Sequence, residues 1–417
     1  MARQLGVQSG ATKFAPPYYV RGLALGIPAY LIGIHLWTWV FMLSILLGGR
    51  ADFRQLYTAG FMVRSGHARQ LYDYDSQHRF QNEFVSPGDI ALPFNHLAYE
   101  ALLFAPFSRL PFRTAYFTFL GMNLGLLALS FRLLRPRMDK IAEVWRWLPA
   151  AMFLGFLPVA VALMQGQDSI LLLTLLVAAM AALQQGRELT AGSLVGLGLF
   201  KFQIVIPIAL LFLVWRRQRF FAGFALSGAA AAAVSLWLVG FSQAVVYTHS
   251  LVSMSIGLAS RVDQFRYGIS PAAMPNLRGL IFGLADTRLS GFWVQAVTIV
   301  LSGMVLLWVA RVVPERLLGA DALLLAITAS AVVSYHLLIH DLSALLIPIA
   351  VTLNRFVEAE ATGDRCGRLI ARASALMFVA PICMSYSPGH FYLVSLPLLA
   401  FLFAITAVSR DYVIFRG

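Results

Sequence analysis

Long apolar runs separated by short basic loops dominate the chain. The first run, Tyr19–Leu47, is followed by a polar stretch and then by His96–Phe107, an apolar piece too short to cross a bilayer. Because an α-helix needs about 20 apolar residues to span the hydrocarbon core, the pattern predicts an all-α polytopic membrane protein with about 10–13 transmembrane or re-entrant helices. The remaining runs lie near 113–134, 147–164, 169–184, 190–215, 220–240, 291–310, 320–335, 342–354, 373–386 and 391–409.

The composition excludes the other broad classes of protein. Hydrophobic residues make up 59% and charged residues 12% of the 417 residues, whereas soluble domains are about 45–50% apolar and about 25% charged. The apolar residues are contiguous rather than alternating, which argues against an outer-membrane barrel. The net charge of +13 fits Lys and Arg in cytoplasmic loops beside anionic lipid, so we expect no nucleic-acid partner.

The basic residues also orient the predicted spans, because Lys and Arg accumulate in cytoplasmic loops. They place both termini in the cytoplasm. This orientation requires that 96–107 does not cross, and that the run 190–215 either breaks near Lys201 or enters and leaves on the inner side. The basic clusters are Arg3–Arg21, Arg132–Arg146, Arg216–Arg219, Arg311–Arg316, Arg355–Arg372 and Arg410–Arg416.

Two long segments then lie on the extracytoplasmic side, 48–112 and 241–290, and we expect the first to carry juxtamembrane helices. Two short polar turns, Gln165–Asp168 and His336–Asp341, face the same side. No internal repeat or soluble domain is evident, so the whole chain, 1–417, is predicted to be one integral-membrane domain. Large outer loops facing polar turns favour an active site at the extracytoplasmic face.

Asp52 is the first candidate for chemistry. It follows the first apolar run and precedes an amphipathic stretch that predicts a helix from Phe53 onward, with Phe53 and Leu56 turned toward lipid. Aspartate is a common helix N-cap, and it is also a suitable general base when it is held at an interface. Both interpretations of Asp52 stay open.

Three more polar positions lie in or beside apolar runs. His96 is either a donor to a phosphate or an interfacial histidine. Gln167 lies in the turn Gln165–Asp168, where Gly166 permits a tight turn and the amides bind a polar ligand or simply form the turn. Lys201 is flanked by phenylalanines, and an ionisable residue there is a functional candidate with a phosphate as partner, unless it snorkels to an interface.

The second outer loop and the last polar turn supply further polar groups. Arg278 offers the fork geometry that binds phosphate at two points. His336 and His340 are spaced as zinc ligands on a helix would be, but the glutamate of an H-E-x-x-H motif is missing. We therefore expect His340 and Asp341 to contact a ligand, and we expect no metal there.

The remaining motifs give little information about function. The pair Asp73-Tyr74-Asp75 has the spacing of a divalent-metal site but is more commonly a solvated acidic turn, and the sequence leaves this open. Neither a G-x-S-x-G motif nor a P-loop occurs, so a serine hydrolase and an NTP-driven pump have no support.

An ordered set of motifs resembles bacterial glycosyltransferase family 87, whose members have the GT-C fold. The resemblance extends roughly over residues 30–350. The matching pieces are Asp52-Phe53 to Tyr57, Ala59-Gly60, Ser65-Gly66, Leu71-Tyr72-Asp73, Asn95-His96 to Pro106, Gly166-Gln167, Gly196 to Lys201, Asn276-Leu277-Arg278-Gly279 and His340-Asp341-Leu342.

The resemblance implies an inverting transfer of a hexose, most often mannose, in the bacterial inner (plasma) membrane. The donor is a polyprenyl-phosphate-linked sugar, the acceptor is a glycolipid or glycan, and the reaction needs neither a metal nor a cofactor. It implies that Asp52 is the general base. The residues that we predict to bind substrates are Arg54, Tyr57, His96, Gln167, Lys201, Arg278, His340 and Asp341.

Two other functions stay open at this point. One is a lipid-linked-sugar flippase or transporter, against which the non-crossing piece and the absent repeat symmetry argue. The other is an undecaprenyl-glycan ligase or polymerase, which would use one large, Arg-rich outer loop with a catalytic histidine, a description that the segment 241–290 does not exclude.

Overall fold

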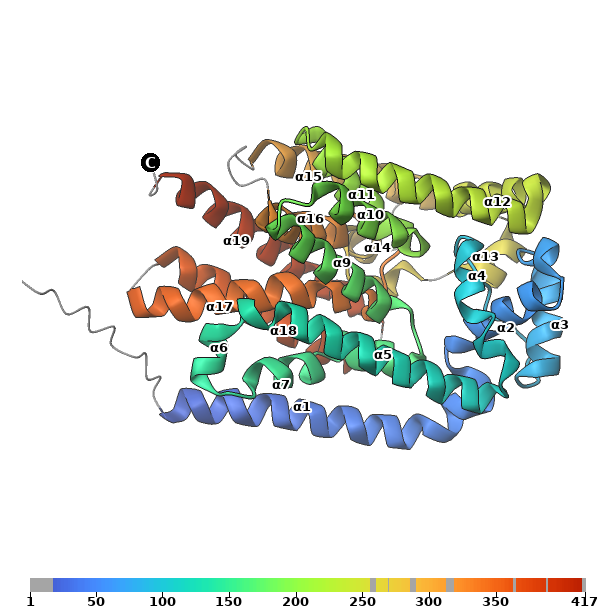
Figure 1. Ribbon diagram of the computed structural model, residues 1–417, viewed down its shortest axis with the longest axis horizontal. Helices are drawn as coiled ribbons and strands as arrows, with labels where there is room; N and C mark the ends of the chain where they lie inside the picture. Colours follow the sequence, from blue (N-terminus) through green and yellow to red (C-terminus); the bar gives the residue numbers. More distant parts are fainter. Residues whose placement is uncertain are drawn as a thin grey trace, which may run out of the picture.

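The computed structural model describes residues 18–255, 260–268, 270–285, 290–312, 319–362, 365–387 and 389–414. These residues form an elongated helical structure in which no strand occurs (Figure 1). The α-helices are α1 (Tyr18–Ile45), α2 (Phe53–Arg64), α3 (Tyr74–Phe84), α4 (Tyr99–Phe104), α5 (Phe112–Leu134), α6 (Asp139–Val144), α7 (Leu148–Gly155), α8 (Leu157–Gln165), α9 (Ser169–Gln184), α10 (Glu188–Leu197), α11 (Phe202–Val214), α12 (Gln218–Ser255), α13 (Arg261–Tyr267), α14 (Leu277–Ala285), α15 (Gly291–Val312), α16 (Ala320–Val333), α17 (Leu346–Thr362), α18 (Arg365–Ser385) and α19 (Ser395–Ile414).

The expected class, an all-α polytopic membrane protein, is confirmed. In the described part of the chain, 4 helical segments are long and apolar enough to cross a membrane, or up to 6 if the bent pairs α7–α8 and α10–α11 each count as one span. Further apolar helices are shorter, among them α9 and α16. The expected 10–13 helices included such short and re-entrant elements, which length and composition alone do not identify as spans.

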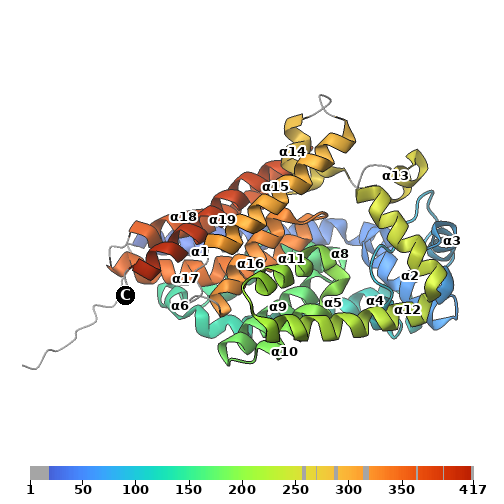
Figure 2. The ribbon, with the colours of Figure 1, turned by 90° about the horizontal axis from the view of Figure 1, so that it is seen from above.

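The helices of the first long polar stretch gather at one end of the molecule. Figures 1 and 2 show α2, α3 and α4 there together with α13, whereas α6, the start of α1 and the end of α19 lie at the other end. An ion pair between Arg266 of α13 and Asp75 of α3, at 3.0 Å, joins the two long predicted outer segments. The stretch 48–112 therefore forms a helical cap rather than an irregular loop.

The helix α2 begins at Phe53 as the sequence predicted, but its apolar face does not point to lipid. Phe53 and Leu56 are completely buried, and the ring of Phe53 stacks on Phe119 of α5 at 5.2 Å. The reason is the close packing of α4 on α2: a Cβ added to Gly60 would lie 2.4 Å from the Phe104 carbonyl carbon. The amphipathic pattern thus marked a protein-facing surface, and the lipid-facing interpretation was wrong.

The apolar run 190–215 is broken near Lys201, which is one of the two arrangements that the basic residues allowed. It consists of α10, a 3₁₀ turn at Leu199–Lys201 and α11, and the two helices differ in direction by 62°. The first half packs very closely on α12, since a Cβ on Gly192 would lie 1.8 Å from the Phe220 carbonyl oxygen. Small residues permit such contacts between membrane helices, and here they fix the position of the break that carries Lys201.

Candidate active site

Asp52 is bound to the turn between α8 and α9. The Gln167 side-chain amide donates to Asp52 Oδ2 at 2.7 Å, and the Asp52 backbone N–H donates to Gln165 Oε1 at 3.2 Å. Asp52 occupies the N-cap position of α2, but its side chain makes no capping hydrogen bond. Its carboxylate therefore faces Gln167 instead of the helix end.

The turn reaches Asp52 because of Gly166. This residue has φ 62°, in the left-handed region, and a Cβ here would lie 2.8 Å from the Cβ of Phe53. The backbone carbonyl of Gln167 accepts from the Asn123 side chain at 3.1 Å, which anchors the turn to α5. The tight turn predicted from the glycine is present, and it brings Gln167 to Asp52 across 115 residues of sequence.

A buried charge cluster begins at the next residue. Asp168 Oδ1 lies 3.0 Å from Lys201 Nζ, and the same nitrogen lies 3.1 Å from Asp341 Oδ1. The exposed fractions of Asp168, Lys201 and Asp341 are 1%, 4% and 2%. Lys201 therefore does not snorkel to an interface. It lies at the helix break between two carboxylates, one from each predicted polar turn.

His340 belongs to the same cluster. Its Nδ1 lies 3.0 Å from Ser169 Oγ and 3.1 Å from Asp341 Oδ1, while its Nε2 is buried and has no hydrogen-bond partner among the described residues. His336 does not share a helix face with it, because the 3₁₀ helix containing His340 begins only at Ile339. The structure therefore gives no support to a zinc site of this pair.

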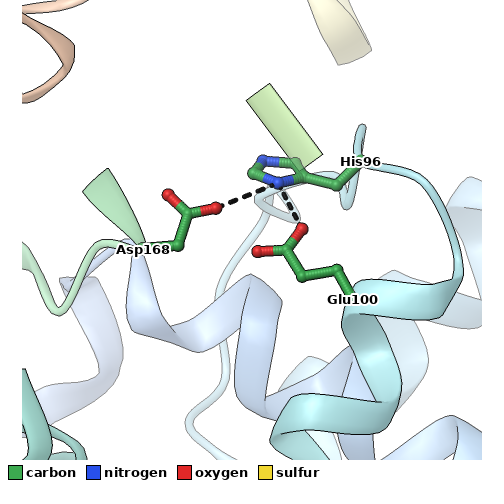
Figure 3. A group of neighbouring side chains, drawn as sticks. All are labelled: His96, Glu100 and Asp168. Carbon is green, nitrogen blue, oxygen red and sulfur yellow. Dashed lines mark ion pairs between the residues drawn. The ribbon is translucent and has the colours of Figure 1, made fainter. Parts of the chain in front are cut away.

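His96 also belongs to the cluster, where it contacts Asp168 and a residue outside the predicted set, Glu100. Its Nδ1 lies 2.5 Å from Glu100 Oε2 and 3.3 Å from Asp168 Oδ2 (Figure 3). Burial alone would lower the pKa of His96, but the two carboxylates raise it to about 10. Burial raises the pKa of Glu100 to about 8, against the attraction of His96. This corner of the cluster strongly favours positive charge.

Aromatic residues fix the position of His96. Its ring stacks on Phe94, with centroids 5.4 Å apart, and the Tyr72 hydroxyl donates to the His96 carbonyl at 2.9 Å. The Tyr247 hydroxyl donates to the Asn95 carbonyl at 3.1 Å. The long helix α12 therefore helps to orient a histidine from the first outer segment.

Three predicted substrate-binding residues lie apart from these contacts. Arg54 donates to the carbonyls of Gly49 and Ser86 at 3.3 and 2.8 Å. These bonds connect the residues before α2 to those after α3. The Tyr57 hydroxyl donates to the Leu110 carbonyl at 2.9 Å. Arg278 donates to the Tyr335 carbonyl at 3.0 Å, and its guanidinium lies over the Tyr335 ring at 4.3 Å. Their binding roles stay predictions.

The acidic pair Asp73 and Asp75 has other partners. Asp73 Oδ2 accepts from the Ser76 backbone N–H at 2.9 Å as the N-cap of α3, and Asp75 pairs with Arg266. Within the described ranges, His96, Glu100 and Asp168 are instead the group whose ligand atoms could hold a metal ion, all lying within 4.8 Å of one another.

The sequence analysis did not identify Glu100 as a site residue, and it did not identify the partners of Asp168. A signal for Glu100 exists, because it stands four residues after His96 as the acidic residue of a short apolar stretch, and such a spacing pairs side chains on a helix. The sequence predicts Asp168 only as the last residue of the polar turn Gln165–Asp168. Asp168 precedes α9, but its side chain makes no capping hydrogen bond. No local pattern shows that it meets Lys201.

A comparison with protein-family models gave a match. The model of glycosyltransferase family 87 matches residues 99–339, more than half of the chain. The match includes Glu100, Gln167, Asp168 and Lys201, whereas Asp52 lies before it. No curated protein and no solved structure matched the chain. The chain therefore belongs to glycosyltransferase family 87.

Proposed function

We propose that this glycosyltransferase is an inverting enzyme of the GT-C fold. It transfers a hexose, mannose foremost, from a polyprenyl-phosphate-linked donor to a glycolipid or glycan acceptor. The observation that carries the proposal is the hydrogen bond between Gln167 and Asp52. It connects the predicted base to the buried cluster that contains Lys201 and His340, where a leaving phosphate finds cationic partners.

The base is placed for proton transfer. Asp52 is half-buried, and Gln167 holds one oxygen of its carboxylate. The carboxylate takes the proton of the acceptor hydroxyl as the hydroxyl oxygen forms a bond to the anomeric carbon. The bond from that carbon to the phosphate oxygen breaks on the opposite face, so the configuration inverts and the lipid phosphate leaves with both bonding electrons.

The buried cluster supports the leaving group. Lys201 supplies a fixed positive charge at the helix break, and the free Nε2 of His340 supplies one further donor once it carries a proton. Preorganised cations in a site that excludes water stabilise developing negative charge more strongly than they do in water. Gln167 Oε1 is buried without a hydrogen-bond partner among the described residues, so it is available to accept from a sugar hydroxyl.

The proposed site opens on the outer face of a bacterial inner membrane. The cap formed by α2, α3 and α4 lies at the end of the molecule opposite the start of α1 and the end of α19 (Figure 1). The basic residues beside α6 lie at that other end too, which supports cytoplasmic termini and an extracytoplasmic site.

A transfer assay in membranes tests the donor class. Radiolabelled polyprenyl-phosphate-mannose is presented on the outer side together with acceptor lipids, and we expect a labelled product that requires the protein. Other hexoses on the same carrier test the sugar. Product formed directly from a nucleotide sugar in lipid-carrier-free membranes would contradict the proposal, and so would the absence of product from every polyprenyl-phosphate hexose.

A further inference from the structure

We propose that His96, Glu100 and Asp168 form a binding site for one divalent transition-metal ion (Figure 3). The site lies beside the residues of the proposed transfer reaction, and it does not depend on that function. Its three ligands come from two separate parts of the chain. A bound ion would therefore tie α4 to the turn that holds Asp52.

The distances between the three ligand atoms are close to those of a metal site. His96 Nδ1, a Glu100 oxygen and an Asp168 oxygen lie within 4.8 Å of one another, and Nδ1 is 2.5 and 3.3 Å from the two carboxylates. In a tetrahedral site, ligands about 2.1 Å from the ion are about 3.4 Å apart. Asp168 Oδ2 already lies near that distance from His96 Nδ1, so accommodating an ion needs His96 Nδ1 and Glu100 Oε2 to separate by about 1 Å.

Three buried carboxyl groups meet one lysine and one histidine in this cluster. The carboxylates of Glu100, Asp168 and Asp341 are 0%, 1% and 2% exposed, and Lys201 is the fixed cation that contacts two of them. Glu100 Oε2 pairs with His96 Nδ1, while Glu100 Oε1 is buried without a hydrogen-bond partner among the described residues. Buried carboxylates are costly unless they are paired or bind a metal, and a divalent ion would pair with Glu100 and Asp168 in place of a proton on His96.

The surroundings of the three ligands suit a metal site. Residues that hold the ligands in place commonly tune such sites. Here Phe94 stacks on the imidazole of His96 and Tyr72 binds its backbone carbonyl, while Lys201 occupies one oxygen of Asp168. The other carboxylate oxygen of Asp168 faces the imidazole.

The donor set indicates the kind of ion. One imidazole nitrogen with two carboxylate oxygens suits Mn²⁺ or Zn²⁺, whereas Mg²⁺ and Ca²⁺ prefer oxygen ligands alone. Three protein ligands leave coordination positions for water or a substrate oxygen.

The test is metal binding by the purified full-length protein. The protein in detergent is stripped with a chelator, incubated separately with Mn²⁺ and Zn²⁺, desalted and analysed for bound metal. We expect about one ion per chain for at least one of the two metals. With Mn²⁺, pulsed electron paramagnetic resonance should detect coupling to a histidine nitrogen, a signal that needs no variant.

Substitutions assign the site. Glu100→Gln should weaken binding about tenfold or more, because it removes a charged ligand, and His96→Ala should abolish the nitrogen coupling. Glu83→Gln is the matched control, since Glu83 is an exposed glutamate of the same outer segment. Size-exclusion profiles identify variants that fail to fold. Wild-type protein that binds neither metal would overturn the proposal, as would binding that Glu100→Gln and His96→Ala both leave unchanged.

Discussion

Replacing Lys201 by methionine should destabilise the protein strongly. The change keeps the length of the side chain and removes the charge that lies 3.0 Å from Asp168 and 3.1 Å from Asp341. All three groups are buried, so both carboxylates lose the lysine that contacts them in a buried site. Removing one partner of a buried ion pair costs about 3–5 kcal/mol.

The chain contains a matched control for burial. Lys140 Nζ lies at the same distance, 3.0 Å, from Glu143 Oε1, but the two side chains are 36% and 50% exposed. Exposed pairs of this kind contribute about 0–1 kcal/mol. Lys140→Met should therefore lower the free energy of unfolding far less than Lys201→Met, although the two substitutions are chemically identical.

The assay is reversible unfolding in detergent–lipid micelles with a chelator present, so that no bound cation replaces the lysine. The double variant Lys201→Met, Asp168→Asn should be more stable than Lys201→Met alone, because it removes one of the unpaired charges. The reasoning is refuted if Lys201→Met and Lys140→Met have equal effects, or if the second substitution destabilises the protein further.

Two glycine substitutions test the geometry around the site. Gly166→Ala should abolish most transfer activity, because the new Cβ meets Phe53 at 2.8 Å beside Asp52. Gly66 also has a positive φ but lies in open space, so Gly66→Ala should keep the transfer activity; equal activities of the two variants would contradict this reasoning. Gly192→Ala should lower the free energy of unfolding by about 1–3 kcal/mol through overpacking of α10 on α12. Gly125 has nothing within 4 Å of an added Cβ, so Gly125→Ala should change the free energy of unfolding little. Unfolding in micelles measures both variants, and equal losses would argue against the close contact.

Much of the fold follows from patterns along the chain. Apolar runs locate most helices because only helices satisfy their backbone groups within lipid. A break near Lys201 was one of two arrangements of the run 190–215 that agree with the basic loops. The helix after Asp52 was also predictable. What its apolar side contacts was not, because a local pattern does not distinguish lipid from the aromatic side chains of α4 and α5.

The individual polar residues of the site were predictable from the sequence, but their partners were not. Lys201, His340 and Asp341 attract notice because polar groups in apolar runs need partners. Which partner each one finds depends on contacts between distant segments. Asp168, which precedes α9, pairs with Lys201 at the break between α10 and α11. Glu100 lies in a short stretch that is mostly apolar.

The central claim is that Asp52 is the base of a transfer reaction at this cluster. Its most direct test is the single-turnover rate of hexose transfer from polyprenyl-phosphate-hexose by Asp52→Asn, compared with Asp89→Asn, which changes an exposed aspartate of the same outer segment. We predict a rate about 10²- to 10⁴-fold below wild type for Asp52→Asn and an unchanged rate for Asp89→Asn. Full transfer activity in a folded Asp52→Asn protein would contradict the account.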